Sequence, residues 1–289
     1  MDFIQPTTWE QALAAKAEQP DAVPIVGGTD VMVDVNFGRH GPESLLDLGR
    51  VAELRDRATD DDAIWLGAGV TYTQVIDELA DRLPGLAMAS RTVGSPQIRN
   101  RGTVGGNLGS ASPAGDSHPP LLAAETEVEV ASVHGERRIP ITEFYVGPGR
   151  HALAEDELIK GIRVLPPGGP QQFCKIGTRN AMVISVSAFA IALHPDRREV
   201  GTGIGSAAPT PRRALEAGKY LAAALADAGL WESREPLPDE MCRHFGDLVR
   251  SAAQPIDDVR GSAAYRAHSL AVMARRAVTW AWNDYRKAA

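Results

Sequence analysis

The sequence predicts a mixed α/β protein, of the α+β type, built from two domains. Its length of 289 residues suits two domains of ordinary size, which run to roughly 100–200 residues each. Signals for short strands and helices alternate through the first half, and three strand signals followed by helices fill the second. A run of prolines and glycines at residues 166–170 separates the halves. We therefore place one domain at 1–168, with subparts of about 1–55 and 56–168, and the other at 171–286.

The first subpart is predicted to hold one helix and two short strands. Residues 8–11, Thr-Trp-Glu-Gln, have the spacing of a capping box, and alanine and leucine continue a helix behind it. Residues 23–26 are apolar and form a buried strand that runs into Gly27 and Gly28. Residues 44–48 form a second short strand.

The second subpart opens with a strand at 63–69 that ends in glycines. A capping box at 71–74 then begins a helix that runs to about Arg82, before Pro84 and Gly85. A long glycine-rich stretch follows from Val93 to Pro120. Further strands are expected at residues 127–131, around Ile139, and at 158–164.

The second domain is predicted to contain three strands and then helices. The strands lie at residues 172–176, 186–193 and 199–204. Thr210 and Pro211 have the pattern of a helix cap followed by a first-turn proline, which predicts a helix to about Ala228. The last helix is expected from about Ser262 to Tyr285.

Charge and apolar runs exclude several classes of protein. The formal net charge is −7, the pI is near 5.5, and no cluster of Lys and Arg exceeds a doublet, so a nucleic-acid partner is not expected. The longest mostly apolar run, residues 183–193, is far shorter than the ~20 residues that span a bilayer. The N-terminus lacks the basic start and apolar core of a signal peptide. We expect a cytoplasmic protein without a membrane span.

The cysteines exclude two further kinds of site. Cys174 and Cys242 are the two cysteines of the chain, so no disulfide framework is expected. Neither belongs to a C-x-x-C pair, and the chain cannot supply the four thiolates that usually hold an iron–sulfur cluster.

Two glycine-rich loops carry the strongest functional signal. Residues 26–30 (Val-Gly-Gly-Thr-Asp) directly follow a strand, and residues 103–110 (Thr-Val-Gly-Gly-Asn-Leu-Gly-Ser) lie in the long turn-rich stretch. Glycines let backbone N–H groups converge on an anion, and Thr, Ser and Asn add side-chain donors. Each loop taken singly is also compatible with a plain tight turn, but two such loops together could hold a pyrophosphate between them.

Neither loop is a common nucleotide motif. Residues 201–206 imitate part of a Rossmann fingerprint, but Ser206 stands where the last Gly or Ala belongs. The segment then leads into 207–211 rather than directly into a helix. No Walker A loop is present. A bound nucleotide would therefore be held in another way.

A loop rich in proline, residues 112–120, contains two further candidates. Asp116 could accept hydrogen bonds from ribose hydroxyls. His118 is interpreted as a solvated loop histidine, with a role as catalytic base as the alternative, because the sequence shows no partner for it. The seven histidines are scattered and form no zinc motif or catalytic triad, so we assign no catalytic and no metal-binding residue.

These residues together resemble the FAD-binding, or medium, subunit of the molybdenum hydroxylases, the group of xanthine dehydrogenase and aerobic carbon monoxide dehydrogenase. The resemblance covers nearly the whole chain. It rests on four motifs in the same order as in the family: residues 24–30; 97–107, followed by Ser112, Pro113 and Asp116; 203–213; and 255–266.

The resemblance implies a fold and a cofactor. The fold is a two-part vanillyl-alcohol-oxidase or PCMH-type domain with FAD in the cleft between its parts, followed by a domain with a three-stranded sheet and helices. The positions that it assigns to the pyrophosphate are Val26, Gly27, Gly28, Thr29, Asp30, Gly105, Gly106 and Asn107.

It also implies roles for five further residues. Thr103 and Ser110 would add hydroxyl donors. Asp116 would bind the ribitol or ribose end, and Ile159 would pack on the adenine. Lys175 would lie near the isoalloxazine, where a cation can stabilise negative charge on the reduced ring; the alternative is a plain surface lysine on a strand.

One stretch departs from the family pattern. After the lysine the family often carries paired arginines, an acidic residue and sometimes an aromatic. Here the acidic residue is replaced by Asn180 or lost, and residues 177–185 contain no aromatic. This region would shape access to the ring. The identity of the electron acceptor therefore stays open. A family branch inserts a cysteine-bearing loop for an extra cluster, and this chain has none.

The implied function is electron transfer during a hydroxylation on another chain. A large partner would hold the molybdenum cofactor, and a small partner would hold two [2Fe–2S] clusters. Electrons would reach FAD here and leave to NAD⁺, a quinone or O₂. Xanthine or another purine is the first expected substrate, with carbon monoxide, nicotinate and related N-heterocycles behind it, and the assembly would be a dimer of heterotrimers.

Two other functions stay open at this point. A stand-alone FAD oxidase of the wider superfamily often tethers flavin through a histidine where Thr29 stands here, and the chain is short for a fold with its own substrate cap. A non-catalytic assembly subunit would have a degenerate flavin site, whereas the Gly, Thr and Asn donors of both loops are intact.

Overall fold

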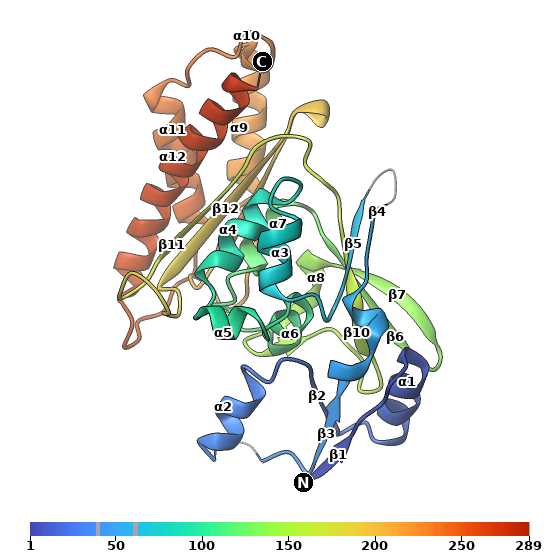
Figure 1. The fold of residues 1–289 in the computed structure, drawn as a ribbon. Helices are drawn as coiled ribbons and strands as arrows, with labels where there is room; N and C mark the ends of the chain where they lie inside the picture. Colours follow the sequence, from blue (N-terminus) through green and yellow to red (C-terminus); the bar gives the residue numbers. More distant parts are fainter. Residues whose placement is uncertain (39–40, 60–62, 289) are drawn as a thin grey trace.

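Figure 1 shows the computed structural model, which describes residues 1–38, 41–59 and 63–288. The N-terminal part has a parallel three-stranded sheet in the order β1-β3-β2, with helix α1 between its first two strands in sequence. Its elements are β1 (Asp2–Ile4), α1 (Trp9–Glu18), β2 (Val23–Ile25), α2 (Val31–Asn36), β3 (Ser44–Asp47) and the short 3₁₀ turns η1 (Leu48–Arg50) and η2 (Ala52–Arg55).

The two predicted strands are confirmed, and β1 was not foreseen because it has three residues and is largely exposed. Thr8 does cap α1, since its hydroxyl accepts from the Gln11 N–H at 3.2 Å. The predicted capping box is incomplete, however. The Gln11 side chain accepts from the N–H of Thr7, one residue earlier than the box requires.

The next part is built on an antiparallel five-stranded sheet in the order β4-β5-β10-β6-β7. Strand β10 returns from far along the chain to lie between β5 and β6, so the last predicted strand of this part occupies the middle of its sheet. The strands are β4 (Arg57–Thr59), β5 (Ile64–Gly67), β6 (Glu127–Ser132), β7 (Gly135–Pro140) and β10 (Leu158–Val164), with a small pair β8 (Tyr145–Gly147) and β9 (Arg150–His151) beside them.

Short helices connect these strands: α3 (Tyr72–Glu78), α4 (Pro84–Thr92), α5 (Pro96–Arg99), α6 (Val104–Ser110), α7 (His118–Ala123) and α8 (Ile141–Phe144). The capping box of α3 is confirmed, with Thr71 and Gln74 bonded reciprocally. The helix ends at Glu78, not near Arg82. Pro84 does not stop a helix but begins one, because its restricted φ suits the first helical position.

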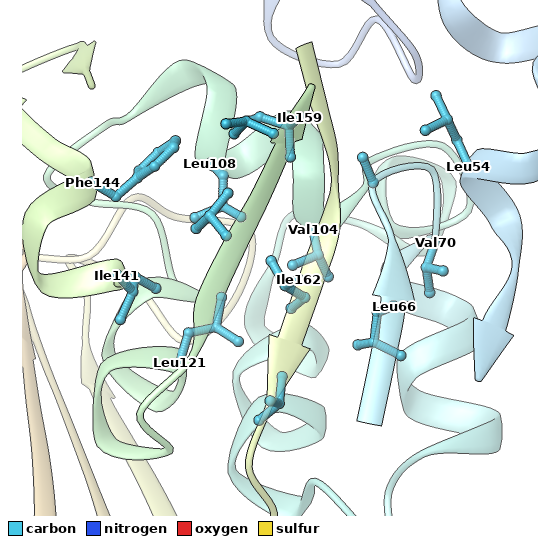
Figure 2. Close-up of a cluster of buried hydrophobic side chains, with 14 of the residues drawn as sticks. Leu54, Leu66, Val70, Val104, Leu108, Leu121, Ile141, Phe144, Ile159 and Ile162 are labelled. Atoms are coloured by element: carbon cyan, nitrogen blue, oxygen red, sulfur yellow. The ribbon is translucent and has the colours of Figure 1, made fainter. Parts of the chain in front are cut away.

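The glycine-rich stretch 93–120 is not a continuous loop. It contains α5, α6 and α7, and the second glycine loop is the start of α6 with Thr103 as its N-cap. Figure 2 shows how α6 contributes to the core: its Val104 and Leu108 belong to the same cluster of buried side chains as Ile162 of β10 and Leu66 of β5.

The C-terminal part has an antiparallel sheet in the order β11-β12-β13. Its strands are β11 (Gln171–Ile176), β12 (Ser187–His194) and β13 (Glu199–Gly205), and its helices are α9 (Leu215–Asp227), α10 (Leu230–Ser233), α11 (Asp239–Ser251) and α12 (Ala263–Lys287), with a 3₁₀ turn η3 (Pro195–Arg197) between two strands. The long helix α12 begins where predicted, with Ser262 as its cap.

The predicted start of a helix at Thr210 and Pro211 is wrong. Arg212 instead exchanges backbone hydrogen bonds with Ile204 of β13, at 2.8 and 3.2 Å, which keeps this segment extended. Helix α9 therefore begins at Leu215, once the chain has left the edge of the sheet.

The C-terminal sheet is covered on both faces (Figure 1). Helices α9, α11 and α12 pack on one face through a core that includes Phe189, Phe245 and Trp282. Helices α4 and α7 pack on the other through small side chains, and Gly203 lies so close to α7 that a Cβ on it would be 2.0 Å from the Pro119 carbonyl oxygen. This close packing joins the two halves of the chain.

Cys174 and Cys242 are both free thiols. Among the described residues, no helix combines the length and apolarity needed to cross a bilayer.

Candidate functional site

A cavity of about 850 Å³ opens where the N-terminal sheet, helix α6 and the C-terminal part meet. This volume lies in the upper part of the range for small-molecule sites, roughly 300–1,000 Å³. Most of its walls come from separated stretches of sequence, around residues 20–31, 93–116, 151–159 and 182–184, and Lys16, Leu48, Ala68 and Tyr72 complete them.

The structure brings twelve of the thirteen predicted site residues to this one cavity. The thirteenth, Lys175, is not among the described residues that line it. The twelve are Val26, Gly27, Gly28, Thr29, Asp30, Thr103, Gly105, Gly106, Asn107, Ser110, Asp116 and Ile159.

The first glycine loop supplies free backbone donors. Within the described part of the chain, the consecutive N–H groups of Gly27, Gly28, Thr29 and Asp30 have no hydrogen-bond acceptor. Gly28 makes this turn possible with φ of +72°, a conformation that L side chains rarely adopt. Consecutive N–H groups on such a turn form a concave site for an anion. Burial raises the pKa of the Asp30 carboxyl. An anionic ligand would be held by the backbone N–H groups of this turn and not by the acidic side chain.

The second glycine loop has no such donors to spare. The N–H of Val104 bonds Val70 O, and that of Gly105 bonds Ala68 O, both at 3.2 Å. The next N–H, of Gly106, bonds the Thr103 hydroxyl at 2.9 Å. The expectation that both loops offer backbone N–H groups is therefore corrected. The first turn of a helix leaves N–H groups without helical partners, and here two residues just after β5, Ala68 and Val70, and the Thr103 cap already accept them. The second loop shapes the cavity wall instead.

The two loops touch through their backbones. A Cβ on Gly27 would lie 1.9 Å from the Arg101 carbonyl oxygen, which no side chain allows. A Cβ on Gly102 would lie 3.3 Å from the Thr29 hydroxyl. Glycine is therefore required at the seam between the two subparts, because only a bare backbone permits this approach.

Asp116 lies at the C-terminal end of the cavity and is 7% exposed. Its Oδ2 accepts from Thr92 Oγ1 at 3.0 Å and from Lys175 Nζ at 2.5 Å, and its Oδ1 accepts from Ser185 Oγ at 2.5 Å. An ionised carboxylate has about four acceptor positions, so roughly one stays available for a ligand. Lys175 is 9% exposed, which excludes the alternative of a plain surface lysine.

The prediction of a solvated His118 is wrong. The side chain is fully buried at the start of α7, and its Nδ1 lies 2.8 Å from the Tyr145 hydroxyl. Burial lowers the pKa of His118 to about 3, so the imidazole is neutral at physiological pH. The apolar run after it, residues 119–124, was the available signal, because it indicates that this short helix is buried on all sides. A buried neutral imidazole bonded to a tyrosine is a structural group.

Several lining residues were not foreseen from the sequence. Lys16 is buried and donates to the carbonyls of Pro20 and Ala22, which shapes the end of the cavity near Ile159. Met182, Val183 and Ile184 also line the cavity, in the stretch where the chain departs from the family pattern, and the next residue, Ser185, bonds Asp116. The left-handed Met182, with φ of 51°, is held by the Arg179 guanidinium, which donates to its carbonyl. The apolar pattern of residues 182–184 does not by itself indicate a ligand, but the family resemblance had placed the stretch 177–185 where it would shape access to the ring.

No group of three or more His, Cys, Asp or Glu side chains in the described ranges could hold a metal ion. The donors that line the cavity are backbone N–H groups, hydroxyls and amides, which suit an organic phosphate better than a cation.

Two family descriptions match the chain in tandem. Residues 1–167 match the "FAD binding domain in molybdopterin dehydrogenase" and residues 172–281 match the "CO dehydrogenase flavoprotein C-terminal domain". The putative xanthine dehydrogenase FAD-binding subunit XdhB of Escherichia coli K12 is 30% identical over 287 residues, covering 96% of this chain and 94% of that protein. The carbon monoxide dehydrogenase medium chain of Afipia carboxidovorans is 29% identical over 287 residues, covering 96% and 95%.

Solved structures show the same fold. A chain of the reconstituted CO dehydrogenase from Oligotropha carboxidovorans superposes with a TM-score of 0.89 at 27% identity, with 98% of each chain covered. A chain of quinoline 2-oxidoreductase from Pseudomonas putida 86 superposes with a TM-score of 0.88 at 20% identity, which supports the fold alone.

Proposed function

The chain belongs to the family of FAD-binding medium subunits of molybdenum hydroxylases, and from this we propose that it carries electrons between partner-bound iron–sulfur clusters and an external acceptor. The observation that carries the proposal is the row of four free N–H groups at 27–30 on the wall of the cavity. We assign the FAD pyrophosphate to these donors, because a dianionic group satisfies several of them at once.

The remainder of the cavity fits the two ends of a dinucleotide. Ile159 and Leu153 offer an apolar surface for the adenine at one end. Asp116 and the wall formed by residues 182–184 would surround the isoalloxazine, and Asn107 and Ser110 also line the cavity. FAD bound here would accept single electrons and release them in pairs. The chain's own task would be to orient the flavin, exclude water from one face and leave an edge accessible.

The partners and substrate are proposed from the family. A large subunit would bind the molybdenum cofactor and the substrate, and a small subunit would carry two [2Fe–2S] clusters, in a dimer of heterotrimers. Electrons would leave to NAD⁺, a quinone or O₂. The relatives named for xanthine and for carbon monoxide are nearly equally similar to this chain, so similarity does not choose between these substrates. We keep a purine as the first proposed substrate, and the choice would be made by the pocket of the large subunit.

A stand-alone oxidase is the second candidate, and the site offers less for it. Such an enzyme needs its own base beside the substrate, and the histidine once considered for that role, His118, is buried and neutral. The position at which flavin is often tethered holds Thr29, whose hydroxyl cannot replace an imidazole in that bond.

The test is whether FAD binds at the first loop. We expect the chain, purified alone and with co-expressed partners, to retain flavin, seen by its visible absorption band. Gly28→Val should abolish retention because a β-branched residue is strained at φ of +72° and would turn the free N–H groups away.

The matched control is Gly149→Val. Gly149 also has a positive φ, +65°, and is exposed at a turn that does not belong to the described wall of the cavity. This variant should suffer similar backbone strain and still bind flavin. A wild-type chain that takes up no FAD with or without partners, or equal retention in both variants, would remove the basis of the proposal.

A further inference from the structure

Four polar side chains form a buried network behind the C-terminal end of the cavity. Asp116 accepts hydrogen bonds from Thr92, Lys175 and Ser185, and Lys175 also donates to the Thr92 carbonyl at 3.3 Å. Asp116 and Thr92 belong to the part of the chain that matches the FAD-binding domain, whereas Lys175 and Ser185 belong to the C-terminal part. The network therefore joins the two parts directly beside the cavity.

Of the two charged groups in this network, the one nearer to a ligand in the cavity is the Asp116 carboxylate. Asp116 lines the cavity, while Lys175 is not among the described residues that do so. The ammonium lies behind the carboxylate at 2.5 Å, and both side chains are less than a tenth exposed. Because the two opposite charges lie 2.5 Å apart, a ligand in the cavity meets them mainly as a near-neutral pair.

We propose that Asp116 and Lys175 act on the flavin as one charge-compensated unit, with Asp116 as the positioning residue and Thr92 and Ser185 fixing its orientation. The inference rests on the proposed function, because it takes the isoalloxazine to lie at this end. Lys175 thus does not stabilise negative charge on the ring as an isolated cation would. Its charge is largely compensated by Asp116, and the net effect on the flavin depends on both residues.

The Ser185 contact gives the network a second consequence. Ser185 is 1% exposed and directly follows Met182, Val183 and Ile184, which line the same end of the cavity. Its hydrogen bond to Asp116 anchors the C-terminal end of that apolar wall, while the Arg179 bond to the Met182 carbonyl holds the other end. The carboxylate that holds Lys175 thus also holds the wall facing the ring.

The test is the flavin reduction potential of four forms of the full chain loaded with FAD, all measured at the same pH. Lys175→Met leaves an uncompensated carboxylate, which should lower the potential because negative charge disfavours reduction. Asp116→Asn leaves an uncompensated ammonium and should raise it. The double variant removes both charges and should return close to the wild-type potential.

A control variant tests whether a change in potential comes from the charges beside the flavin or from the loss of an ion pair between the two parts of the chain. Glu125→Gln weakens a different ion-pair cluster, in which Glu125 bonds Arg197 at 2.8 Å and Arg213 at 3.1 Å. None of the three belongs to the described wall of the cavity. This variant should lower the melting temperature and leave the potential unchanged.

The outcomes distinguish the two proposals. A wild-type chain that binds no FAD overturns the proposed function, and this inference with it. If FAD binds but the double variant behaves like Lys175→Met, the lysine acts as an independent cation and the paired unit is wrong. If Asp116→Asn does not fold, Ser185→Ala replaces it. That variant removes a donor from the carboxylate without changing formal charge, so we expect a smaller decrease in potential than for Lys175→Met, and an unchanged potential contradicts the proposal.

Discussion

Neighbouring glycines at the start of α6 should separate flavin binding from stability. A Cβ on Gly105 would lie 2.5 Å from Ala68 Cβ and 2.6 Å from its carbonyl oxygen, atoms that cannot move without moving the sheet. Overpacking of this kind costs roughly 1–3 kcal/mol. A loss of 1 kcal/mol corresponds to about 2–4 °C in melting temperature for a domain of this size. Gly105→Ala should therefore melt several degrees lower in the absence of flavin.

The next glycine should behave in the opposite way. A Cβ on Gly106 would have one neighbour within 4 Å among the described residues, the Thr103 hydroxyl oxygen at 3.1 Å, and would otherwise face the cavity. Valine is favoured over glycine in a helix by roughly 0.3 kcal/mol, which offsets part of that tight contact. The branched methyls would, however, exclude ligand atoms from within about 3.5 Å of each. Gly106→Val should keep its melting temperature while its FAD dissociation constant rises at least tenfold, a loss of about 1.4 kcal/mol.

Both properties are measured on the same preparations, by thermal unfolding followed by circular dichroism without FAD and by titration of FAD followed by flavin fluorescence. Wild-type FAD affinity in Gly106→Val would show that the second loop does not face the ligand. An unchanged melting temperature in Gly105→Ala would show that the contact with Ala68 is not tight.

Two further predictions concern buried polar groups. The folded-state pKa of His118, about 3, lies below its unfolded value near 6.5, so the neutral ring stabilises the fold above pH 6.5 and this stabilisation is lost as the pH falls toward 3. His118→Gln should show a shallower decrease in melting temperature over that range, and an equal slope would contradict burial as the cause. Arg266 is 3% exposed and donates to the carbonyls of Val186 and Ser206 and to Asp258. Arg266→Met should cost on the order of 3 kcal/mol in urea unfolding because these acceptors lose their donor; a loss below about 1 kcal/mol would assign those bonds little weight.

Local sequence was sufficient for most of the strands, for the starts of α1, α3 and α12, and for twelve of the residues that line the cavity. Caps, turn residues and apolar periodicity act over a few residues, so the strands on both sides of the 166–170 linker and the start of α12 were predicted correctly. The two glycine motifs were also enough to locate the cavity. One follows a strand and the other begins a helix, and residues of both line the cavity. Their similarity to a known family added the cofactor.

The tertiary structure decided which groups at the site are hydrogen-bonded or buried and which are free to bind a ligand. Whether an N–H is free depends on acceptors from distant segments: Ala68 and Val70 occupy those of the second loop, while those of the first loop stay free. Lys175 and Asp116 are 59 positions apart in the sequence but form a hydrogen-bonded ion pair in the structure. Lys175 is not among the described residues that line the cavity. The burial of His118 could not be predicted from local sequence either, because burial depends on all the elements that pack around a residue. Hydrogen bonding and burial are sums over neighbours in space, and local sequence specifies few of those neighbours.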